Sequence, residues 1–252
     1  MEKTSVLSDI RVIVLDVDQT LLDFNACARL SLNQAFEKAG LKWKDEDFPI
    51  FIASNNLLWK KLESKEMSDQ QFRQIRFPSF LQKIGYPQAD GLKMEEYFRF
   101  FLDQSHETMD RAHETLEFLS GRYPLYVLTN GRQLQQEHRL DLAGFLPMIE
   151  QVVSSEKAGA MKPQRQIFEY LMTRLRKNMP DLKPEEVLMI GDSYESDIQG
   201  AAGYGLSTLW LNQDIAQASG LDIDPNRKNA AMHLSAENWD QIACLFKDWK
   251  SV

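Results

Sequence analysis

Residues 10–20 have the sequence IRVIVLDVDQT, a short apolar run that ends at two aspartates. The run Ile10–Leu15 is rich in β-branched residues, which predicts a buried strand of a parallel sheet. Asp16 and Asp18 follow it directly and, two residues apart in extended backbone, can face the same side. Because an idle carboxylate at the end of a buried strand is costly to desolvate, the pair predicts a catalytic or binding role.

Four more short apolar runs follow, at Leu125–Leu128, Ile149–Val153, Val187–Ile190 and Thr208–Leu211. Helical patterns lie among the later runs, at Ala112–Leu119, Ile167–Leu175 and Asp197–Ala202. This alternation predicts an α/β fold, with a mostly parallel sheet covered by helices on both faces. The end of the chain is expected to add a closing strand and helix, packed through Trp239, Ile242, Leu245 and Phe246.

About 100 residues without a strand-like segment separate the first two runs, far more than an ordinary connection. This stretch contains four helical patterns, at Ala26–Ala39, Phe51–Leu62, Ser68–Ile84 and Met94–Gln104. Ser68 is the expected N-cap of the third helix. The sequence therefore predicts a helical domain at residues 23–108, inserted into a core made of residues 1–22 and 109–252.

The composition is that of an ordinary globular protein, with 252 residues, 43% hydrophobic residues and a net charge of -8. The negative charge argues against binding to nucleic acid polymers or to anionic membranes. Cys27 and Cys244 form neither a metal-binding spacing nor a disulfide framework and are expected to be small buried hydrophobes. With neither a signal peptide nor an apolar run of about twenty residues, we expect a cytoplasmic protein, with a monomer as the default state.

Three more polar segments lie at the end of a strand or just before a helix, where open parallel sheets bind ligands. The first is Thr129-Asn130-Gly131, whose hydroxyl and backbone N–H groups suit the oxygens of a phosphoryl group. An Asn-Gly corner is also an ordinary turn, so this segment alone leaves both possibilities open. The second is Met161-Lys162-Pro163. Its proline is expected at the first position of a helix at Gln164–Lys177.

An ammonium group on Lys162 could neutralise both a carboxylate nucleophile and a substrate phosphate, with Lys157 as the nearest alternative. The third segment follows the strand at Val187–Ile190 and includes Asp192 and Asp197. Magnesium prefers oxygen ligands, so Asp192 could complete a site begun by Asp16 and the Asp18 carbonyl. Asp197 could support the metal shell, or it could begin the next helix, where a carboxylate suits the helix dipole.

In this order, the segments resemble the haloacid dehalogenase (HAD) superfamily. Its pattern is Asp-x-Asp-x-Thr, a strand-end Thr or Ser, a Lys, and Gly-Asp-x-x-x-x-Asp. The resemblance extends from about residue 10 to residue 212 and implies a Rossmann-like core, a helical cap and a Mg²⁺ cofactor. Gln19 departs from the commoner pattern, which has glycine there, and this puts the local turn in question.

The resemblance assigns a role to each matching residue. Asp16 is the nucleophile that forms an aspartyl-phosphate, and Asp18 is the general acid and base. Thr129, the Asn130 backbone and Lys162 bind the phosphoryl group. Asp16, Asp18 and Asp192 bind magnesium, and Asp197 supports that metal site.

Three segments also resemble the pyrimidine 5′-nucleotidase subgroup of HAD enzymes. They are SSEKAGAMKP at 154–163, LMIGDSYESDIQGAAGYG at 188–205 and WLN at 210–212. The resemblance implies a small phosphomonoester substrate, with a pyrimidine nucleoside 5′-monophosphate as the preferred one. Phe24 and Asn25 are the expected substrate contacts from the cap, although Phe24 fits the role of a hinge-packing residue equally well.

Three other functions fit parts of the pattern. A receiver domain of a signalling protein also uses a phospho-accepting aspartate, magnesium and a lysine. The long helical insert and the late Asp192–Asp197 segment argue against it. A phosphomutase, or a phosphatase acting on phosphoglycolate or a sugar phosphate, remains an alternative within the same family.

Overall fold

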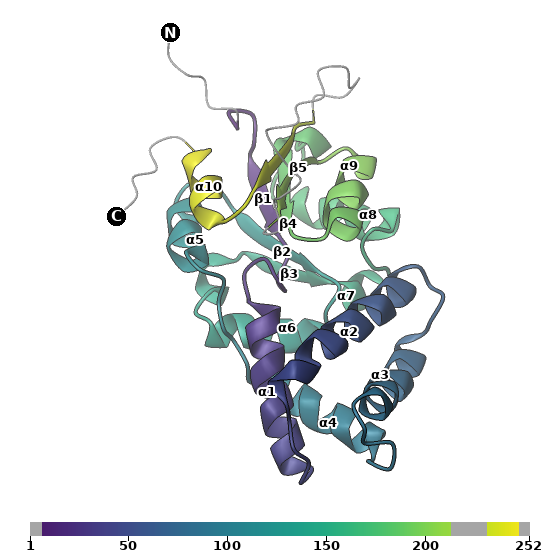
Figure 1. Ribbon diagram of the computed structural model, residues 1–252. Coiled ribbons are helices and arrows are strands. Elements are labelled where there is room, and N and C mark those ends of the chain that lie inside the picture. The colour runs from purple at the N-terminus through teal and green to yellow at the C-terminus, as the bar shows by residue number, and fades with distance from the viewer. Residues whose placement is uncertain (1–6, 213–230, 247–252) are drawn as a thin grey trace. The chain divides into compact units, whose positions relative to one another are not determined.

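The computed structural model describes residues 7–212 and 231–246, and the chain divides into two compact units. One unit comprises Met1–Asp23 and Thr108–Val252, and it contains the sheet (Figure 1). The other comprises Phe24–Glu107 and is built from four helices. The prediction of an α/β fold with a helical insert after the first strand is confirmed.

The sheet has six strands in the order β3-β2-β1-β4-β5-β6, and every neighbouring pair is parallel. The strands are β1 (Val12–Leu15), β2 (Leu125–Thr129), β3 (Gln151–Ser154), β4 (Val187–Gly191), β5 (Ser207–Leu211) and β6 (His233–Ala236). All five apolar runs form strands, with small differences at their ends, and β6 is the expected closing strand. This strand order, with β1 near the middle, is that of a doubly wound Rossmann-like sheet.

Alternation along β1 explains why helices cover both faces of the sheet. Ile13 and Leu15 point into one apolar core, whereas Val12 and Val14 point into the other. The first core also includes residues of α5, α6 and α10, and the second includes residues of α8 and α9. The helices of this unit are α5 (Ala112–Ser120), α6 (Gln133–Leu142), α7 (Ser155–Ala158), α8 (Arg165–Leu175), α9 (Gly200–Tyr204) and α10 (Trp239–Cys244), with a π-helical turn at Tyr194–Gln199 and 3-10 turns at Leu146–Met148 and Pro184–Glu186.

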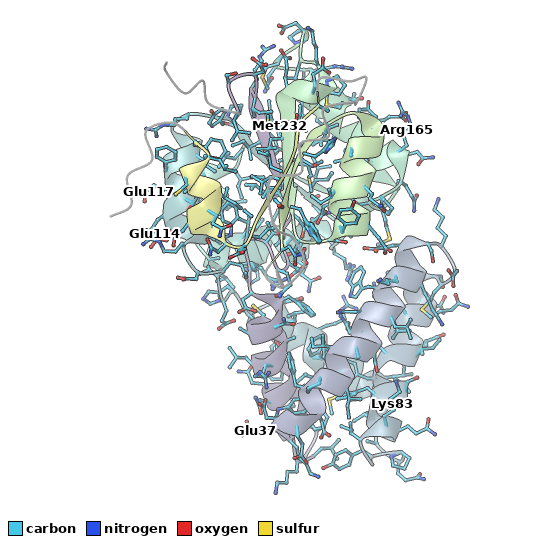
Figure 2. All side chains as sticks on the ribbon, turned by 45° about the horizontal axis from the view of Figure 1, so that its top comes forward. Glu37, Lys83, Glu114, Glu117, Arg165 and Met232 are labelled. Atoms are coloured by element: carbon cyan, nitrogen blue, oxygen red, sulfur yellow. The ribbon has the colours of Figure 1, made fainter. Side chains whose placement is uncertain are left out.

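The outer sides of α5 and α8 are largely polar, as their amphipathic patterns require. Glu114 and Glu117 of α5 and Arg165 of α8 are exposed and lie at the periphery of the unit in Figure 2. In contrast, Leu116 of α5 and Phe168 of α8 are fully buried against the sheet. Within the described residues, the structure has no helix that is both long and apolar enough to span a membrane.

The helical unit consists of α1 (Phe24–Lys38), α2 (Phe48–Glu63), α3 (Asp69–Lys83) and α4 (Gly91–Leu102), with a 3-10 turn at Asp45–Asp47. Ser68 is the N-cap of α3, as predicted. Its hydroxyl accepts a bond from the Gln71 backbone N–H at 3.2 Å, and the Gln71 side chain accepts one from the Ser68 N–H at 2.9 Å. Buried phenylalanines from all four helices form the core of this unit.

One buried ion pair lies within that aromatic core. Arg76 of α3 donates two bonds to the Glu95 carboxylate of α4, at 2.9 and 2.7 Å. It donates a third to Asn55 of α2 at 3.2 Å. All three side chains are buried, so the network joins three helices through polar groups that are largely shielded from solvent.

Three expectations from the sequence are wrong. Pro163 does not begin a helix, because Met161–Gln164 forms a turn, with Gln164 as the N-cap of α8. Asp197 lies inside the π-helical turn rather than at a helix start, because Ser193 is the N-cap there. Cys244 is exposed, at the C-terminal end of α10, whereas Cys27 is buried as expected.

We predict that Glu95→Leu lowers the free energy of unfolding by about 3–5 kcal/mol, because it leaves the Arg76 guanidinium buried without its counter-charge. The double change Arg76→Met with Glu95→Leu should recover most of this loss, since it removes both charges. Denaturant unfolding followed by circular dichroism measures the effect.

Glu96→Leu is the matched control, because Glu96 is on the same helix and pairs with Lys93 at the surface. Exposed pairs contribute about 0–1 kcal/mol, so this variant should unfold close to the wild type. If Glu95→Leu and Glu96→Leu lowered the free energy of unfolding equally, the buried pair would not be the source of the predicted effect.

Candidate active site

The polar segments predicted from the sequence meet at the carboxyl ends of three adjacent strands. Asp16 follows β1, Thr129 ends β2, and Asp192 follows β4. The Asp16 backbone N–H donates to the Ile190 carbonyl at 2.9 Å, which continues the pairing of β1 with β4. In doubly wound sheets, ligands bind at this edge, where the strand order reverses.

Lys162 is the central residue of the site. Its ammonium group lies 2.5 Å from Asp16 Oδ1, 2.7 Å from the Leu128 carbonyl oxygen and 2.7 Å from Asp197 Oδ1. The ammonium donates hydrogen bonds to Asp16 and to the Leu128 carbonyl, and it forms an ion pair with Asp197. Because Lys162 is only 2% exposed, these contacts fix the charge beside Asp16.

Asn130 positions the backbone of Lys162. Its side-chain oxygen accepts from the Lys162 N–H at 2.8 Å, and its NH₂ group donates to the Lys162 carbonyl at 3.0 Å. Thr129 is also buried, and its hydroxyl accepts a bond from the Gly131 N–H at 3.0 Å. The Thr129–Gly131 segment is therefore joined directly to the Lys162 segment.

Three carboxylates lie close together beside this ammonium. One oxygen each of Asp16, Asp192 and Asp197 falls within 4.8 Å of the others. Burial raises the pKa of Asp16 to about 7. The Lys162 ammonium acts in the opposite direction and lowers this pKa, whereas the negative charge of Asp197 raises it further. Burial, with the charges of Asp197 and Asp16, also raises the pKa of Asp192 well above its ordinary value.

Burial alone would lower the pKa of Lys162, but Asp16 and Asp197 outweigh it and raise that pKa. Three acidic groups thus face one fixed positive charge. The cluster has an excess of negative charge and the hard oxygen ligands that suit a divalent cation. The residues present therefore fit Mg²⁺, which Asp16 and Asp192 would hold, with Asp197 in an ion pair with Lys162.

Asp197 is held by close packing as well as by charge. Its Oδ2 accepts a bond from the Ser193 N–H at 3.1 Å. A Cβ atom at Gly191 would lie 2.3 Å from the same oxygen, so a side chain there would displace the carboxylate. Position 191 therefore requires glycine, because the Asp197 carboxylate packs directly against its Cα atom.

Three residues that hold the site together lie outside the segments predicted from the sequence to form it. Gln136 and Arg139 of α6 donate to the Asp18 carboxylate, and Trp210 of β5 donates its indole N–H to the Asp192 carbonyl at 2.7 Å. Gln133, Gln136 and Arg139 are spaced by three residues and are all buried. A polar stripe on the inner side of a helix was the signal that could have indicated them.

Two predicted substrate contacts and one alternative lysine complete the set of residues expected from the sequence. Phe24 and Asn25 begin α1 and belong to the helical unit, so their contact with a substrate stays a prediction. The alternative lysine, Lys157, lies in α7 and is exposed. The structure places Lys162 against Asp16.

Known proteins resemble this chain in both sequence and fold. The sequence pattern of the haloacid dehalogenase-like hydrolases matches residues 10–205. The chain belongs to this family. The prediction of a HAD-like hydrolase is therefore confirmed.

Several relatives match over most of their length. The HAD-hydrolase YfnB of Bacillus subtilis is 33% identical over 81% of this chain and 85% of its own. A crystal structure of YfnB described as bound to magnesium superposes with a TM-score of 0.81, at 28% identity, over 94% of this chain and 99% of that one.

Two relatives are named for a nucleotidase activity. The pyrimidine 5′-nucleotidase PynA of Streptococcus pneumoniae is 33% identical over 80% of this chain and 84% of its own. The pyrimidine 5′-nucleotidase YjjG of Escherichia coli is 30% identical over 79% of this chain and 85% of its own. The chain is therefore a HAD hydrolase with relatives named as pyrimidine 5′-nucleotidases.

Gln19, which departs from the commoner family pattern, adopts the backbone conformation that glycine favours. Its φ angle is 61°, in the left-handed region. Its N–H donates to the Leu22 carbonyl at 2.7 Å, and the N–H groups of Thr20, Leu21 and Leu22 all donate to the Val17 carbonyl. The turn therefore forms with glutamine, at the steric cost of placing a Cβ atom in that region.

We predict that Gln19→Gly raises the free energy of unfolding by up to about 1 kcal/mol, because glycine adopts this φ angle without a Cβ clash. Gln19→Val should lower it, since a β-branched residue is strongly disfavoured there. Denaturant midpoints for the two variants test this order. A valine variant as stable as the glycine variant would contradict it.

Proposed function

We propose that the chain is a Mg²⁺-dependent phosphatase that hydrolyses a small phosphomonoester through an aspartyl-phosphate on Asp16. The observation that supports this most strongly is the contact of Asp16 with the buried Lys162 ammonium, beside Asp192 at the carboxyl edge of the sheet. This arrangement offers a carboxylate nucleophile and a fixed positive charge for a phosphate. It also provides an acidic cluster suited to a cation.

In the first half of the reaction, the Asp16 carboxylate attacks phosphorus and the bond from phosphorus to the leaving oxygen breaks. Asp18 donates a proton to that oxygen, so the alcohol leaves in neutral form. Thr129 and the backbone of Asn130 bind the phosphoryl oxygens, and Lys162 offsets their negative charge. The product of this half is the phosphorylated Asp16.

In the second half, Asp18 takes a proton from water, and the resulting hydroxide attacks phosphorus. The bond between phosphorus and the Asp16 oxygen breaks, which regenerates the carboxylate and releases phosphate. A Mg²⁺ ion held by Asp16, Asp192 and the Asp18 carbonyl would supply positive charge for the substrate phosphate. A phosphomutase is the alternative, in which a second substrate hydroxyl replaces water.

The substrate proposal rests on PynA and YjjG, which are named as pyrimidine 5′-nucleotidases at 33% and 30% identity. We infer that the substrate is a pyrimidine nucleoside 5′-monophosphate, and that residues 23–108 act as a cap domain that contacts it through Phe24 and Asn25. The proposal includes a monomer in the cytoplasm, with neither a nucleic acid polymer nor a membrane as partner.

We predict that Asp16→Asn lowers turnover by several orders of magnitude without unfolding the protein, because an amide is a poor nucleophile toward phosphorus. Phosphate release and circular dichroism measure the two properties. Asp141→Asn is the matched control, since Asp141 is exposed on α6, and it should keep wild-type turnover. Near-wild-type hydrolysis by Asp16→Asn would rule out the proposed mechanism.

Activity should depend on magnesium and disappear in EDTA. We expect Asp192→Ala to raise the magnesium concentration for half-maximal activity by tenfold or more, which is about 1.4 kcal/mol of lost affinity. Titration calorimetry with magnesium alone gives an independent readout, with Asp141→Ala as the control. Unchanged magnesium binding by Asp192→Ala would remove this residue from the metal site.

Catalytic efficiency across a substrate panel tests the nucleotide proposal. The panel contains uridine, deoxyuridine and thymidine 5′-monophosphates, purine monophosphates, hexose phosphates and phosphoglycolate. We expect a pyrimidine monophosphate to lead. If phosphoglycolate or a hexose phosphate led by tenfold, roughly 1.4 kcal/mol of preference, the nucleotidase proposal would fail and the phosphatase proposal would stand.

A further inference from the structure

Two side chains of α6 bind the Asp18 carboxylate, one on each oxygen. Arg139 Nη1 lies 2.7 Å from Oδ1, and Gln136 Nε2 lies 2.8 Å from Oδ2. Arg139 and Gln136 are 1% and 2% exposed, whereas the Asp18 side chain is 34% exposed. An accessible carboxylate is thus held by two donors that solvent does not reach.

The helix that carries these donors is itself fixed to the sheet. Leu140 of α6 is fully buried in the same apolar core as Leu15 of β1. Gln133, at the start of α6, donates to the Val152 carbonyl of β3 at 3.0 Å. Because α6 is anchored at these points, its donors have a defined position relative to Asp18.

The backbone before α6 leaves space for this contact. A Cβ atom at Gly131 would lie 2.3 Å from Gln136 Nε2 and 2.8 Å from Gln136 Cγ. The clash involves much of the glutamine side chain, so any residue larger than glycine would move Gln136 away from Asp18. Gly131, Gln136 and Asp18 therefore form one packed arrangement.

We propose that Gln136 and Arg139 are positioning residues that hold the Asp18 carboxylate where it exchanges protons with the leaving group and with water. This inference rests on the proposed function, in which Asp18 is the general acid and base. Each carboxylate oxygen has two lone-pair sites, so one donor per oxygen leaves a site on each for the transferred proton. The two donors fix the plane of the carboxylate and leave its chemistry available.

The expected effect of losing the donors follows from geometry. A general acid or base contributes about 10²–10⁴-fold to a rate, and only when it lies within hydrogen-bond reach of the reacting oxygen. An aspartate without these contacts can adopt other rotamers, and a displacement of about 1 Å can cost about 10²-fold. Loss of the donors should therefore slow the steps that need proton transfer.

The test compares two leaving groups. An alkyl phosphate such as a nucleoside 5′-monophosphate releases an alkoxide that needs a proton from Asp18. p-Nitrophenyl phosphate releases a stable anion that does not. For Arg139→Met and Gln136→Leu, we expect kcat/KM to fall by about ten- to hundredfold with the alkyl phosphate. With p-nitrophenyl phosphate it should fall by less than about threefold, because its first half-reaction needs no acid.

The second half-reaction adds an independent signature. Breakdown of the phosphorylated Asp16 needs a base whichever substrate formed it. Both variants should therefore show a burst of p-nitrophenolate followed by slow turnover. Arg139→Lys should recover part of the alkyl phosphate activity. Asp141→Asn is the matched control, because Asp141 lies on the same helix with its side chain exposed and contributes to neither the Asp18 contacts nor the anchoring of α6.

Gly131→Ala tests the same arrangement without changing any donor. It should reproduce the selective loss with the alkyl phosphate, and it should add little further loss in a Gln136→Ala background, where the clash is absent. Because Gly131→Ala and Gln136→Ala leave Arg139 unchanged, they test the inference even if the Arg139 variants do not fold.

Asp18→Asn distinguishes the positioning role of Gln136 and Arg139 from the proposed function of Asp18. If Asp18→Asn shows the selective loss but the Gln136, Arg139 and Gly131 variants lose activity equally on both substrates, the positioning role is wrong. If Asp18→Asn itself hydrolyses the alkyl phosphate like the wild type, the proposed function of Asp18 is wrong as well.

Discussion

The contact between the Lys162 ammonium and the Asp16 carboxylate is the interaction on which the rest of the site depends. The same ammonium contacts Asp197 and the Leu128 carbonyl, so one buried charge joins the ends of β1 and β2 to the turn that follows β4. An amide at position 16 would still leave the ammonium its partner Asp197, whereas loss of the ammonium would leave two buried carboxylates uncompensated, which is strongly destabilising. The segments can hold their catalytic geometry only while this charge is present.

Much of this arrangement could be predicted from the sequence, because it follows from local patterns. Apolar runs such as Val12–Leu15 and Val187–Gly191 are buried on both faces, and such runs have few alternatives to a parallel strand. In a parallel sheet, the residues that follow each strand lie at one edge. The closeness of Asp16 to Asp192 was therefore predictable from their positions after two strands.

The contacts that come from packing between distant elements were not predictable in this way. Arg139 meets Asp18 because α6 lies against the sheet at a particular depth, and no periodicity in the sequence gives that depth. Trp210 reaches the Asp192 carbonyl across the β4–β5 pair for the same reason. Pro163 was misplaced because proline is compatible with a turn as well as with the first position of a helix, and local propensity does not distinguish the two.

The position of β1 within the sheet has a consequence for how the chain is made. β1 leaves the ribosome before both of its sheet neighbours, β2 and β4, which begin at Leu125 and Val187. The helical unit Phe24–Glu107 is continuous and emerges before either neighbour, so it can fold while β1 still has two unpaired edges. At about 5–20 residues per second, roughly 5–20 seconds pass between the synthesis of β1 and that of β2. During that interval the two edges of β1 are open to pairing with other chains, which is the aggregation hazard of an unpaired apolar strand.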